Sequence, residues 1–218
     1  MPYARDQFDA VARDLVSRRF AVWNLEYRRL GELSGGWPET LCDVAAGIDH
    51  LAGLLTEDAD LDLSRVIVVG YSAGGQLALW ASAQYTGHGM PRVPTPRVRP
   101  VAVAGLAAAL DLAALFAIDA GSGAVGELLG GSPVEQPARY AAASAIKLLP
   151  LGVSQFIVHG TADRALPVQI TRAYVRAATA VGDNIQFREL PCAGHMDHLD
   201  PNSEAHSVLC RWLDQFTK

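Results

Sequence analysis

Residues 66–75 read VIVVGYSAGG and continue without interruption into QLALW. An apolar, β-branched run typical of a buried strand leads directly into a turn around Ser72, and a segment with helical character follows. Small residues beside the serine permit a very tight strand-to-helix turn, which would expose the Ser72 hydroxyl at the end of the strand. The first amides of the helix would point at a reacting carbonyl, where the helix N-terminus favours negative charge. This stretch therefore predicts a nucleophile at Ser72 and an oxyanion donor at the amide of Ala73.

The bare pattern G-x-S-x-G also arises by chance in a glycine-rich chain. Its position between an apolar strand and a helix is the context that supports a nucleophile. A phosphate-binding loop is excluded at this place, because no Gly-Lys-Ser or Gly-Lys-Thr follows the glycines.

Short apolar runs alternate with longer segments of helical spacing throughout the chain. The runs are Phe20–Leu25, Arg65–Gly70, Val101–Leu106, Gln155–His159 and Ile185–Leu190. Amphipathic helices are predicted over residues 8–16, 41–55 and 205–216, where apolar side chains recur every three to four residues. Strands that are apolar almost throughout and are separated by helices indicate a parallel sheet covered on both faces. The predicted fold class is α/β.

Length and composition favour one domain over residues 1–218. The chain has 218 residues, half of them apolar, and no internal repeat. Residues 111–150 interrupt the strand–helix alternation with an Ala- and Gly-rich stretch, which we interpret as a lid-like insertion. The net charge of −5 is modest. A basic cluster at Arg92, Arg97 and Arg99 lies in a proline-rich loop and is interpreted as a solvated face, so neither nucleic acid nor a membrane is expected as a partner.

The N-terminal sequence and the cysteines indicate the cellular compartment of the protein. Met1–Arg19 carries alternating charges and lacks the apolar stretch of a signal peptide, and no run is long enough to span a bilayer. The three cysteines, Cys42, Cys192 and Cys210, are odd in number and widely spaced, which fits neither a disulfide framework nor a zinc ribbon. These features predict a cytoplasmic protein.

A serine nucleophile needs a base and an orienting carboxylate, which follow it in the order Asp or Glu, then His, in this strand–turn–helix context. His195 lies in the loop after the last predicted strand, and Asp163 lies in the loop after the strand that ends at His159. Both loops leave the same edge of a parallel sheet as Ser72. Of the other histidines, His159 is expected to be structural, and His206 belongs to the last helix. We therefore predict a catalytic triad of Ser72, Asp163 and His195.

A metal site is the alternative interpretation of the same region. His195, Asp197 and His198 offer ligand types suited to zinc or iron. No further ligand cluster accompanies them, and the His-x-x-His spacing is common by chance. No metal and no cofactor are therefore expected.

The motifs GYSAGG at 70–75, HGTAD at 159–163 and AGH at 193–195 resemble those of the α/β-hydrolase carboxylesterases, especially the kynurenine-formamidase-like and hormone-sensitive-lipase-like groups. The stretch WNLEYRR at 23–29, with GWP at 36–38 and Asp43, is similar to the same groups. The resemblance covers nearly the whole chain and implies an α/β-hydrolase fold. It also implies that Arg28 and Asp43 are a structural pair.

One feature of these groups is missing. The resemblance implies an earlier strand that ends in a His-Gly-Gly motif, completes the oxyanion hole and lies between the strands at Phe20–Leu25 and Arg65–Gly70. The sequence opens at Met1-Pro2-Tyr3 without that strand. Three outcomes are open: direct pairing of the two flanking strands in a reduced five-stranded sheet, which we expect; a partner subunit that fills the gap; or a natural start further upstream.

The resemblance and the triad together lead to the expectation of a carboxylesterase that cleaves short-chain acyl esters of small molecules through an acyl-enzyme on Ser72. An amidase or formamidase, a peptidase of the same fold, and a non-catalytic binding protein of this fold remain the alternatives. The oligomeric state is open, with a homodimer as one option.

Overall fold

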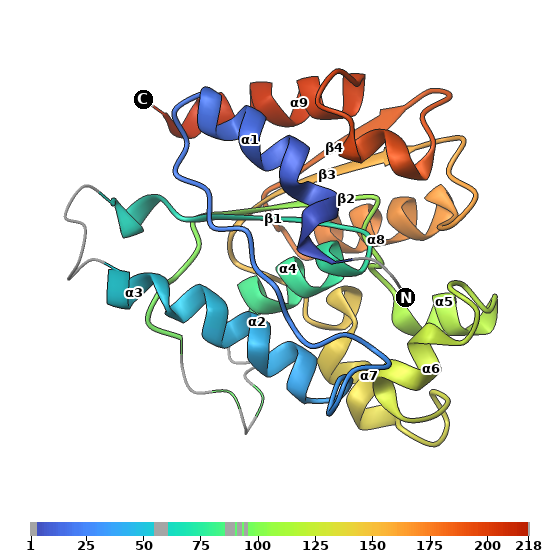
Figure 1. Cartoon of the computed structure of the whole chain (residues 1–218). Coiled ribbons are helices and arrows are strands. Elements are labelled where there is room, and N and C mark those ends of the chain that lie inside the picture. Colours follow the sequence, from blue (N-terminus) through green and yellow to red (C-terminus); the bar gives the residue numbers. More distant parts are fainter. Residues whose placement is uncertain (1–3, 55–60, 86–89, 91–92, 94–95, 218) are drawn as a thin grey trace.

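The computed structural model describes residues 4–54, 61–85, 90, 93 and 96–217. Its centre is a sheet of four parallel strands in the order β1-β2-β3-β4. The strands are β1 (Ile67–Tyr71), β2 (Ala102–Leu106), β3 (Ser154–Gly160) and β4 (Ile185–Leu190). Strand order follows chain order, so each pair of neighbouring parallel strands is joined by a crossover connection (Figure 1). The predicted α/β class is confirmed, and four of the five predicted strands are present within about two residues.

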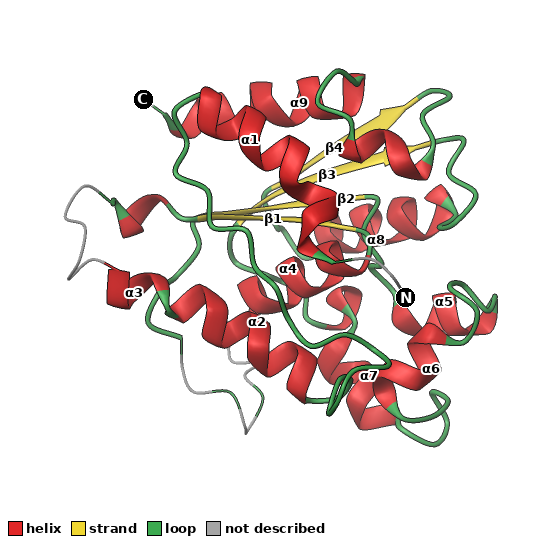
Figure 2. Cartoon of the chain, viewed as in Figure 1, coloured by secondary structure: helices red, strands yellow, loops and turns green. Residues whose placement is uncertain are grey.

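Helices cover both faces of the sheet (Figure 2). On one face lie α1 (Asp9–Ser17) and α9 (Glu204–Leu213), whose apolar side chains pack against β2 and β3 in one hydrophobic cluster. On the other face lie α2 (Glu39–Asp49), α4 (Ala73–Ala83) and α8 (Val168–Ala180), which belong to a larger cluster. Alternate residues of β2 divide between the two clusters, Ala104 to one and Val103 to the other. This two-sided burial explains why β2 appears in the sequence as a continuous apolar run.

The predicted helices are present, with shorter extents. The pattern over 41–55 is divided at His50 into α2 and the one-turn α3 (Leu51–Leu54), and residue 55 lies outside the described residues. The last pattern ends its α-helix at Leu213 and continues as a 3₁₀ turn over Asp214–Phe216. Residues 111–150 form α5 (Leu112–Ala117), α6 (Ala124–Leu129) and α7 (Pro137–Ala143), which lie together at one end of the molecule (Figure 1).

The predicted strand at Phe20–Leu25 is wrong, and so is the five-stranded sheet. In the described part of the chain this segment makes no ladder with β1; it is a connection that passes along the sheet in front of β1 (Figure 2). The segment and β1 line the same cavity, so space separates them. A strand exists only when its backbone groups meet a hydrogen-bonding neighbour, and residue pattern alone cannot supply one.

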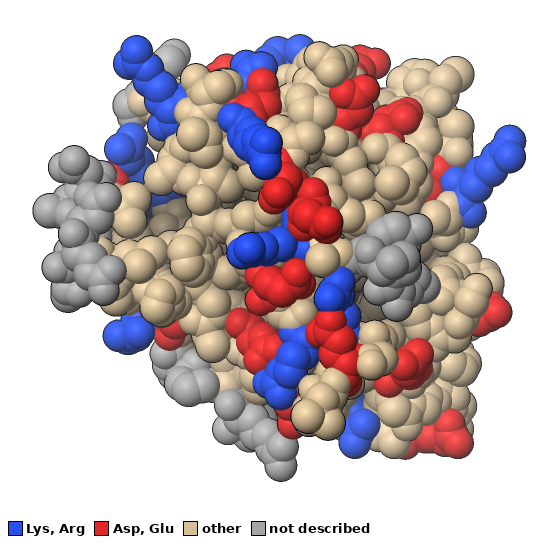
Figure 3. Space-filling model, viewed as in Figure 1, with Lys and Arg blue, Asp and Glu red and all other residues tan. Residues whose placement is uncertain are grey.

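Charged side chains of both signs are interspersed on the face drawn in Figure 3. Of the predicted basic cluster, Arg97 binds Asp49 through its backbone amide and its guanidinium, and Arg99 lies over the ring of Tyr85. Arg92 lies outside the described residues. None of the helices in the described ranges has the length and apolar character needed to cross a membrane.

Candidate active site

Ser72 occupies the turn between β1 and α4 in a conformation that few residues adopt, with φ 53° and ψ −118°. The turn is possible because its neighbours lack side chains. A Cβ on Gly70 would lie 2.1 Å from the carbonyl oxygen of Gly74, and one on Gly75 would lie 2.5 Å from Cβ of Ala108. Glycine at these two positions lets α4 begin directly above the strand and leaves the Ser72 hydroxyl at the carboxyl edge of the sheet.

Ser72, His195 and Asp163 form a continuous hydrogen-bonded chain. Oγ of Ser72 lies 3.0 Å from Nε2 of His195, and Nδ1 of His195 lies 2.7 Å from Oδ2 of Asp163. The serine hydroxyl donates to Nε2 when Nδ1–H donates to the carboxylate, which is the tautomer that general-base catalysis requires. The structure thus brings together the three residues that were predicted from the sequence. They lie on the loops that follow β1, β3 and β4.

The Asp163 carboxylate is fully buried and is surrounded by donors. Oδ1 accepts hydrogen bonds from the amides of Ala165 and Leu166, each at 2.8 Å, and Oδ2 lies 3.1 Å from Nε2 of His159 as well as beside His195. Burial opposes ionisation, but the hydrogen bonds from His159, His195 and the Leu166 amide outweigh it and hold the pKa of Asp163 far below its usual range. The carboxylate therefore stays charged at any working pH.

His159 lies beneath the triad, as the sequence predicted for a structural residue. Its side chain is buried, with Nδ1 2.7 Å from the hydroxyl of Thr171 and Nε2 3.0 Å from the carbonyl oxygen of Leu166. The ring is fixed at both nitrogens and holds the turn that carries Asp163.

The loops that carry Asp163 and His195 are joined at their bases. The amide of Ala162 donates to the carbonyl oxygen of Ala193, and the amide of Cys192 donates to the hydroxyl of Thr161. A Cβ on Gly160 would lie 2.0 Å from the Ala193 carbonyl oxygen, so only glycine permits this approach. No role was predicted for Gly160, although a glycine between His159 and Thr161, at the end of an apolar run, can indicate a close contact.

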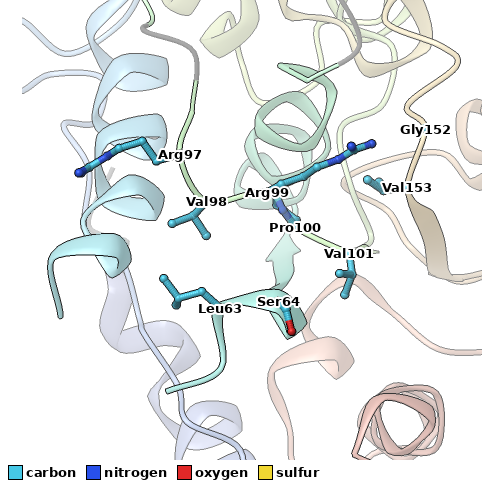
Figure 4. Close-up of a pocket in the computed structure, with 9 residues that line it drawn as sticks. All are labelled: Leu63, Ser64, Arg97, Val98, Arg99, Pro100, Val101, Gly152 and Val153. Atoms are coloured by element: carbon cyan, nitrogen blue, oxygen red, sulfur yellow. The ribbon is translucent and has the colours of Figure 1, made fainter. Parts of the chain in front are cut away.

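Ser72 opens onto a cavity of about 1630 Å³. Residues from several elements line it near the triad: Ala73, Gly74, Ala109, Ala162 and His195, with Leu115, Val125 and Leu128 from the 111–150 region. The cavity also extends along β1 towards Phe20 and Leu213. A second cavity, of about 560 Å³, is lined by Ser64, Val101 and Val153, which precede β1, β2 and β3 (Figure 4). That cavity lies at the opposite edge of the sheet from Ser72 and is not part of this site.

The residues of the alternative metal site do not converge. The ring nitrogens of His195 are engaged by Asp163 and Ser72, the carboxylate of Asp197 accepts the amide of Gly194 at 2.8 Å, and His198 is buried. Burial, then repulsion from His159 and His195, lowers the pKa of His198 to about 4. Among the described residues, three ligand types meet at a different place, where His206 contacts Asp14 and Cys210. Asp14 there is also paired with Arg18 at 2.6 Å.

Arg28 and Asp43 form the pair that the resemblance implied. The guanidinium makes two hydrogen bonds to the carboxylate, at 2.8 and 2.7 Å, and the Arg28 amide makes a third at 3.0 Å. The pair joins the segment before α2 to α2 itself. Neither residue of the pair lines the cavity that Ser72 borders.

A serine at a strand–helix turn, with Asp and His on loops after later parallel strands, defines the α/β-hydrolase fold, here in a reduced form. The family model described as BD-FAE matches residues 2–177, and the chain belongs to this family. No curated protein sequence matches the chain.

Solved structures with the same fold include proteins whose titles name them as esterases. A bifunctional GH43-CE protein of Bacteroides eggerthii superposes with a TM-score of 0.81 at 20% identity, over 97% of this chain and 29% of that one. Esterase B of Lactobacillus rhamnosis gives 0.77 at 17% identity, over 94% and 68%. The esterase Est2 of Thermogutta terrifontis gives 0.71 at 19%, over 97% and 76%. The chain therefore spans less than a third of the first of these proteins, and at these identities the likeness establishes the fold.

Proposed function

We propose that this protein is a carboxylic ester hydrolase that forms an acyl-enzyme on Ser72. The observation that carries the proposal is the hydrogen-bonded chain from Ser72 through His195 to Asp163, at the mouth of a cavity large enough for a substrate. Family membership and the esterase titles of the structural neighbours favour an ester over other acyl compounds.

The proposed reaction has two halves. Ser72 Oγ attacks the ester carbonyl while His195 Nε2 takes the hydroxyl proton, and the resulting imidazolium is stabilised by the charged Asp163. The tetrahedral intermediate collapses, the ester C–O bond breaks, and His195 returns the proton to the departing alcohol. Water then attacks the acyl-enzyme with His195 as base, which releases the acid and restores Ser72.

The amide of Ala73 is the first proposed oxyanion donor. The Gly75 and Gln76 amides donate to the carbonyl oxygen of Ser72, whereas the Ala73 amide has no recorded acceptor among the described residues and borders the cavity. It is therefore free to bind an oxyanion at the N-terminus of α4.

The hydroxyl of Tyr27 is the second proposed donor. It borders the same cavity and lies 3.8 Å from the position that a Cβ on Gly74 would occupy, and it forms no hydrogen bond with the described residues. Burial, and then the charge of Glu26, raises the pKa of Tyr27, so the phenol keeps its proton and stays a donor. No role was predicted from the sequence for Tyr27, which directly precedes Arg28.

Replacement of Tyr27 by phenylalanine tests this role. The expected loss is about 100-fold in kcat, as for removal of one oxyanion donor, with little change in KM. Phenylalanine preserves the ring packing, so the melting temperature should stay near that of the parent. A kcat within twofold of the parent would remove Tyr27 from the mechanism.

Hydrolysis of p-nitrophenyl butyrate by the full chain and by Ser72→Ala tests the function. The parent should turn over the ester, and the variant should lose at least about 10⁴-fold in kcat. Unchanged hydrolysis in Ser72→Ala would refute the assignment. Activity on anilides or formamides but not on esters would instead establish an amidase.

The acyl preference that we propose is for short chains. Small residues, among them Ala73, Gly74 and Ala109, form the wall next to Ser72. In a series of p-nitrophenyl acetate, butyrate and octanoate, kcat/KM should be highest for acetate or butyrate. A maximum at octanoate would contradict this preference.

A further inference from the structure

Three side chains that are common metal ligands meet outside the catalytic site, between α1 and α9. Nε2 of His206 lies 2.6 Å from Oδ2 of Asp14 and 3.2 Å from Sγ of Cys210. One ligand atom from each of the three residues lies within 4.8 Å of the other two. A carboxylate, an imidazole and a thiol therefore converge on one place.

The two helices bring these ligands together. His206 and Cys210 are four residues apart in α9, so their side chains lie on the same face of that helix, and both are almost fully buried. α1 packs beside α9 on the same face of the sheet and supplies Asp14 from 192 positions away in the chain (Figure 1). The prediction that no metal is bound was made from local spacing, which cannot connect Asp14 to α9.

A hydrogen bond between Asp14 and His206 does not account for the position of the sulfur. The carboxylate of Asp14 can only accept, so Nε2 of His206 carries the proton of this contact. The same N–H also faces Sγ of Cys210, and one proton is then shared between two atoms with lone pairs. Oxygen, sulfur and nitrogen thus surround a position that a cation would occupy with all three engaged.

The distances are close to those of a tetrahedral zinc site. With zinc bonds of about 2.1 Å to nitrogen and oxygen and about 2.3 Å to sulfur, the ligand atoms lie about 3.4 Å (N to O) and about 3.6 Å (N to S) apart. The observed distances are 2.6 and 3.2 Å, so each must lengthen by less than about 1 Å. Side-chain adjustment of Asp14, which is 26% exposed, is sufficient for this change.

Arg18 supplies the outer contact that a metal-bound carboxylate usually has. Its Nε lies 2.6 Å from Oδ2 of Asp14, whereas Oδ1 has no recorded partner among the described residues. Rotation of the carboxylate lets one oxygen bind a metal while the other keeps its hydrogen bond to Arg18. Because Asp14 is partly exposed, water can reach the remaining coordination position.

We propose that Asp14, His206 and Cys210 bind one zinc ion, with water as the fourth ligand. Sulfur and imidazole nitrogen select a borderline-soft metal such as Zn²⁺ over Mg²⁺ and Ca²⁺, which prefer several oxygen ligands. Binding releases the thiol proton of Cys210 to solvent and moves the His206 proton from Nε2 to Nδ1. Nδ1 has no recorded partner among the described residues, so this exchange breaks no hydrogen bond there.

The ion would join α1 to α9 and so fasten the beginning of the chain to its end. Ser72, His195 and Asp163 contribute no ligand to it. The zinc site is therefore independent of the proposed hydrolase activity, and it stands even if Ser72 is inert.

Titration of the metal-free full chain with Co²⁺ tests the site. Cobalt replaces zinc in proteins and reports its own ligands: a thiolate gives a charge-transfer band in the near ultraviolet, and tetrahedral coordination gives intense visible bands. Both should appear and saturate at an equimolar ratio of cobalt to protein. Equimolar Zn²⁺ should then abolish them, whereas excess Mg²⁺ should not.

Paired variants assign the ligands. Cys210→Ser should lose the charge-transfer band, and Asp14→Asn should weaken Co²⁺ binding at least about tenfold. The matched controls are Cys192→Ser and Asp6→Asn, two exposed positions outside the cluster, which should keep the parental spectrum. Circular dichroism verifies folding, and the partly exposed Asp14→Asn decides the question should the buried Cys210→Ser fail to fold.

Thermal unfolding supplies a second readout. Zn²⁺ at about 100 times its Kd should raise the melting temperature of the parent by about 5–10 °C, and the same concentration should raise that of Asp14→Asn much less. Absence of the cobalt bands in the parent would show that the cluster is a hydrogen-bonded contact only. Bands that persist unchanged in both Cys210→Ser and Asp14→Asn would place the metal elsewhere. Either result overturns the proposal.

Discussion

Asp163 has the most extensive side-chain hydrogen bonding of the three triad residues. Its carboxylate collects two backbone amides and two imidazoles in a fully buried position, so one side chain both fixes its own loop and orients His195. Such a charge is costly to bury unless every lone pair is engaged, and here the donors come from residues within four positions as well as from the next loop.

Replacement of Asp163 by asparagine keeps the shape of the side chain but removes the negative charge that faces His195. The amide occupies the same volume, but it favours the wrong tautomer of His195, and kcat should fall about 10⁴-fold. Steady-state hydrolysis of p-nitrophenyl butyrate measures the loss, and exposed Asp6→Asn is the matched control that should keep parental activity. A drop of less than tenfold in Asp163→Asn would show that another group orients the histidine.

The triad was predictable from the sequence because each member follows an apolar run, and the carboxyl ends of parallel strands meet at one edge. The contacts that position the triad were not. Gly160 against Ala193, and Tyr27 beside Gly74, are approaches between segments far apart in the chain, and no local pattern encodes the distance between them.

At the scale of elements, the junction between β1 and α4 sets the site. Gly75 packs against Ala108, which follows β2, so a side chain here would push α4 from the sheet. The strand–turn–helix geometry thus depends on the contact between α4 and the end of β2 as much as on the turn itself.

Two glycine-to-alanine variants test this dependence. Gly75→Ala should destabilise the protein by about 1–3 kcal/mol through overpacking. Gly53→Ala, in α3 with open space at its Cβ position and no positive φ, should stabilise it by about 0.5–1 kcal/mol through helix propensity. Urea unfolding followed by circular dichroism gives both values. Equal effects of the two substitutions would contradict the packing argument.

Strands whose burial appears in the sequence as an apolar run were predictable. The pairing of a strand was not, because it depends on which segment lies beside it. β2 and β3 are buried on both faces and appear in the sequence as largely apolar runs, whereas β4 alternates partly buried residues with exposed Gln186 and Arg188. Phe20–Leu25 has the same composition but lies across a cavity from β1 and forms no ladder. Composition reports the burial of a segment, whereas pairing depends on which segment lies next to it.

At the scale of the whole molecule, the buried His198 couples stability to pH. His198 is buried, neither ring nitrogen has a recorded partner among the described residues, and its pKa is lowered to about 4. The unfolded chain binds a proton at this residue near pH 6.5, whereas the folded protein does so only near pH 4. Between these values the unfolded state binds more protons, so the free energy of unfolding falls as the pH is lowered.

The expected slope from His198 is up to about 1.4 kcal/mol per pH unit between pH 6.5 and pH 4. Urea unfolding at half-unit pH intervals measures it in the parent and in His198→Phe. The variant should lose this component of the slope whatever its absolute stability. Identical slopes in the two proteins would show that His198 does not titrate in this window.

Labelling by a fluorophosphonate, followed by peptide mass spectrometry, tests most directly whether Ser72 is an activated nucleophile. An activated serine reacts with the probe and an inert one does not. We expect stoichiometric modification of Ser72 in the full chain, loss of labelling in Ser72→Ala, and strongly slowed labelling in His195→Ala. Absence of label on Ser72 in the folded parent, or label on a different residue, would contradict the proposal that Ser72, His195 and Asp163 act as a catalytic unit.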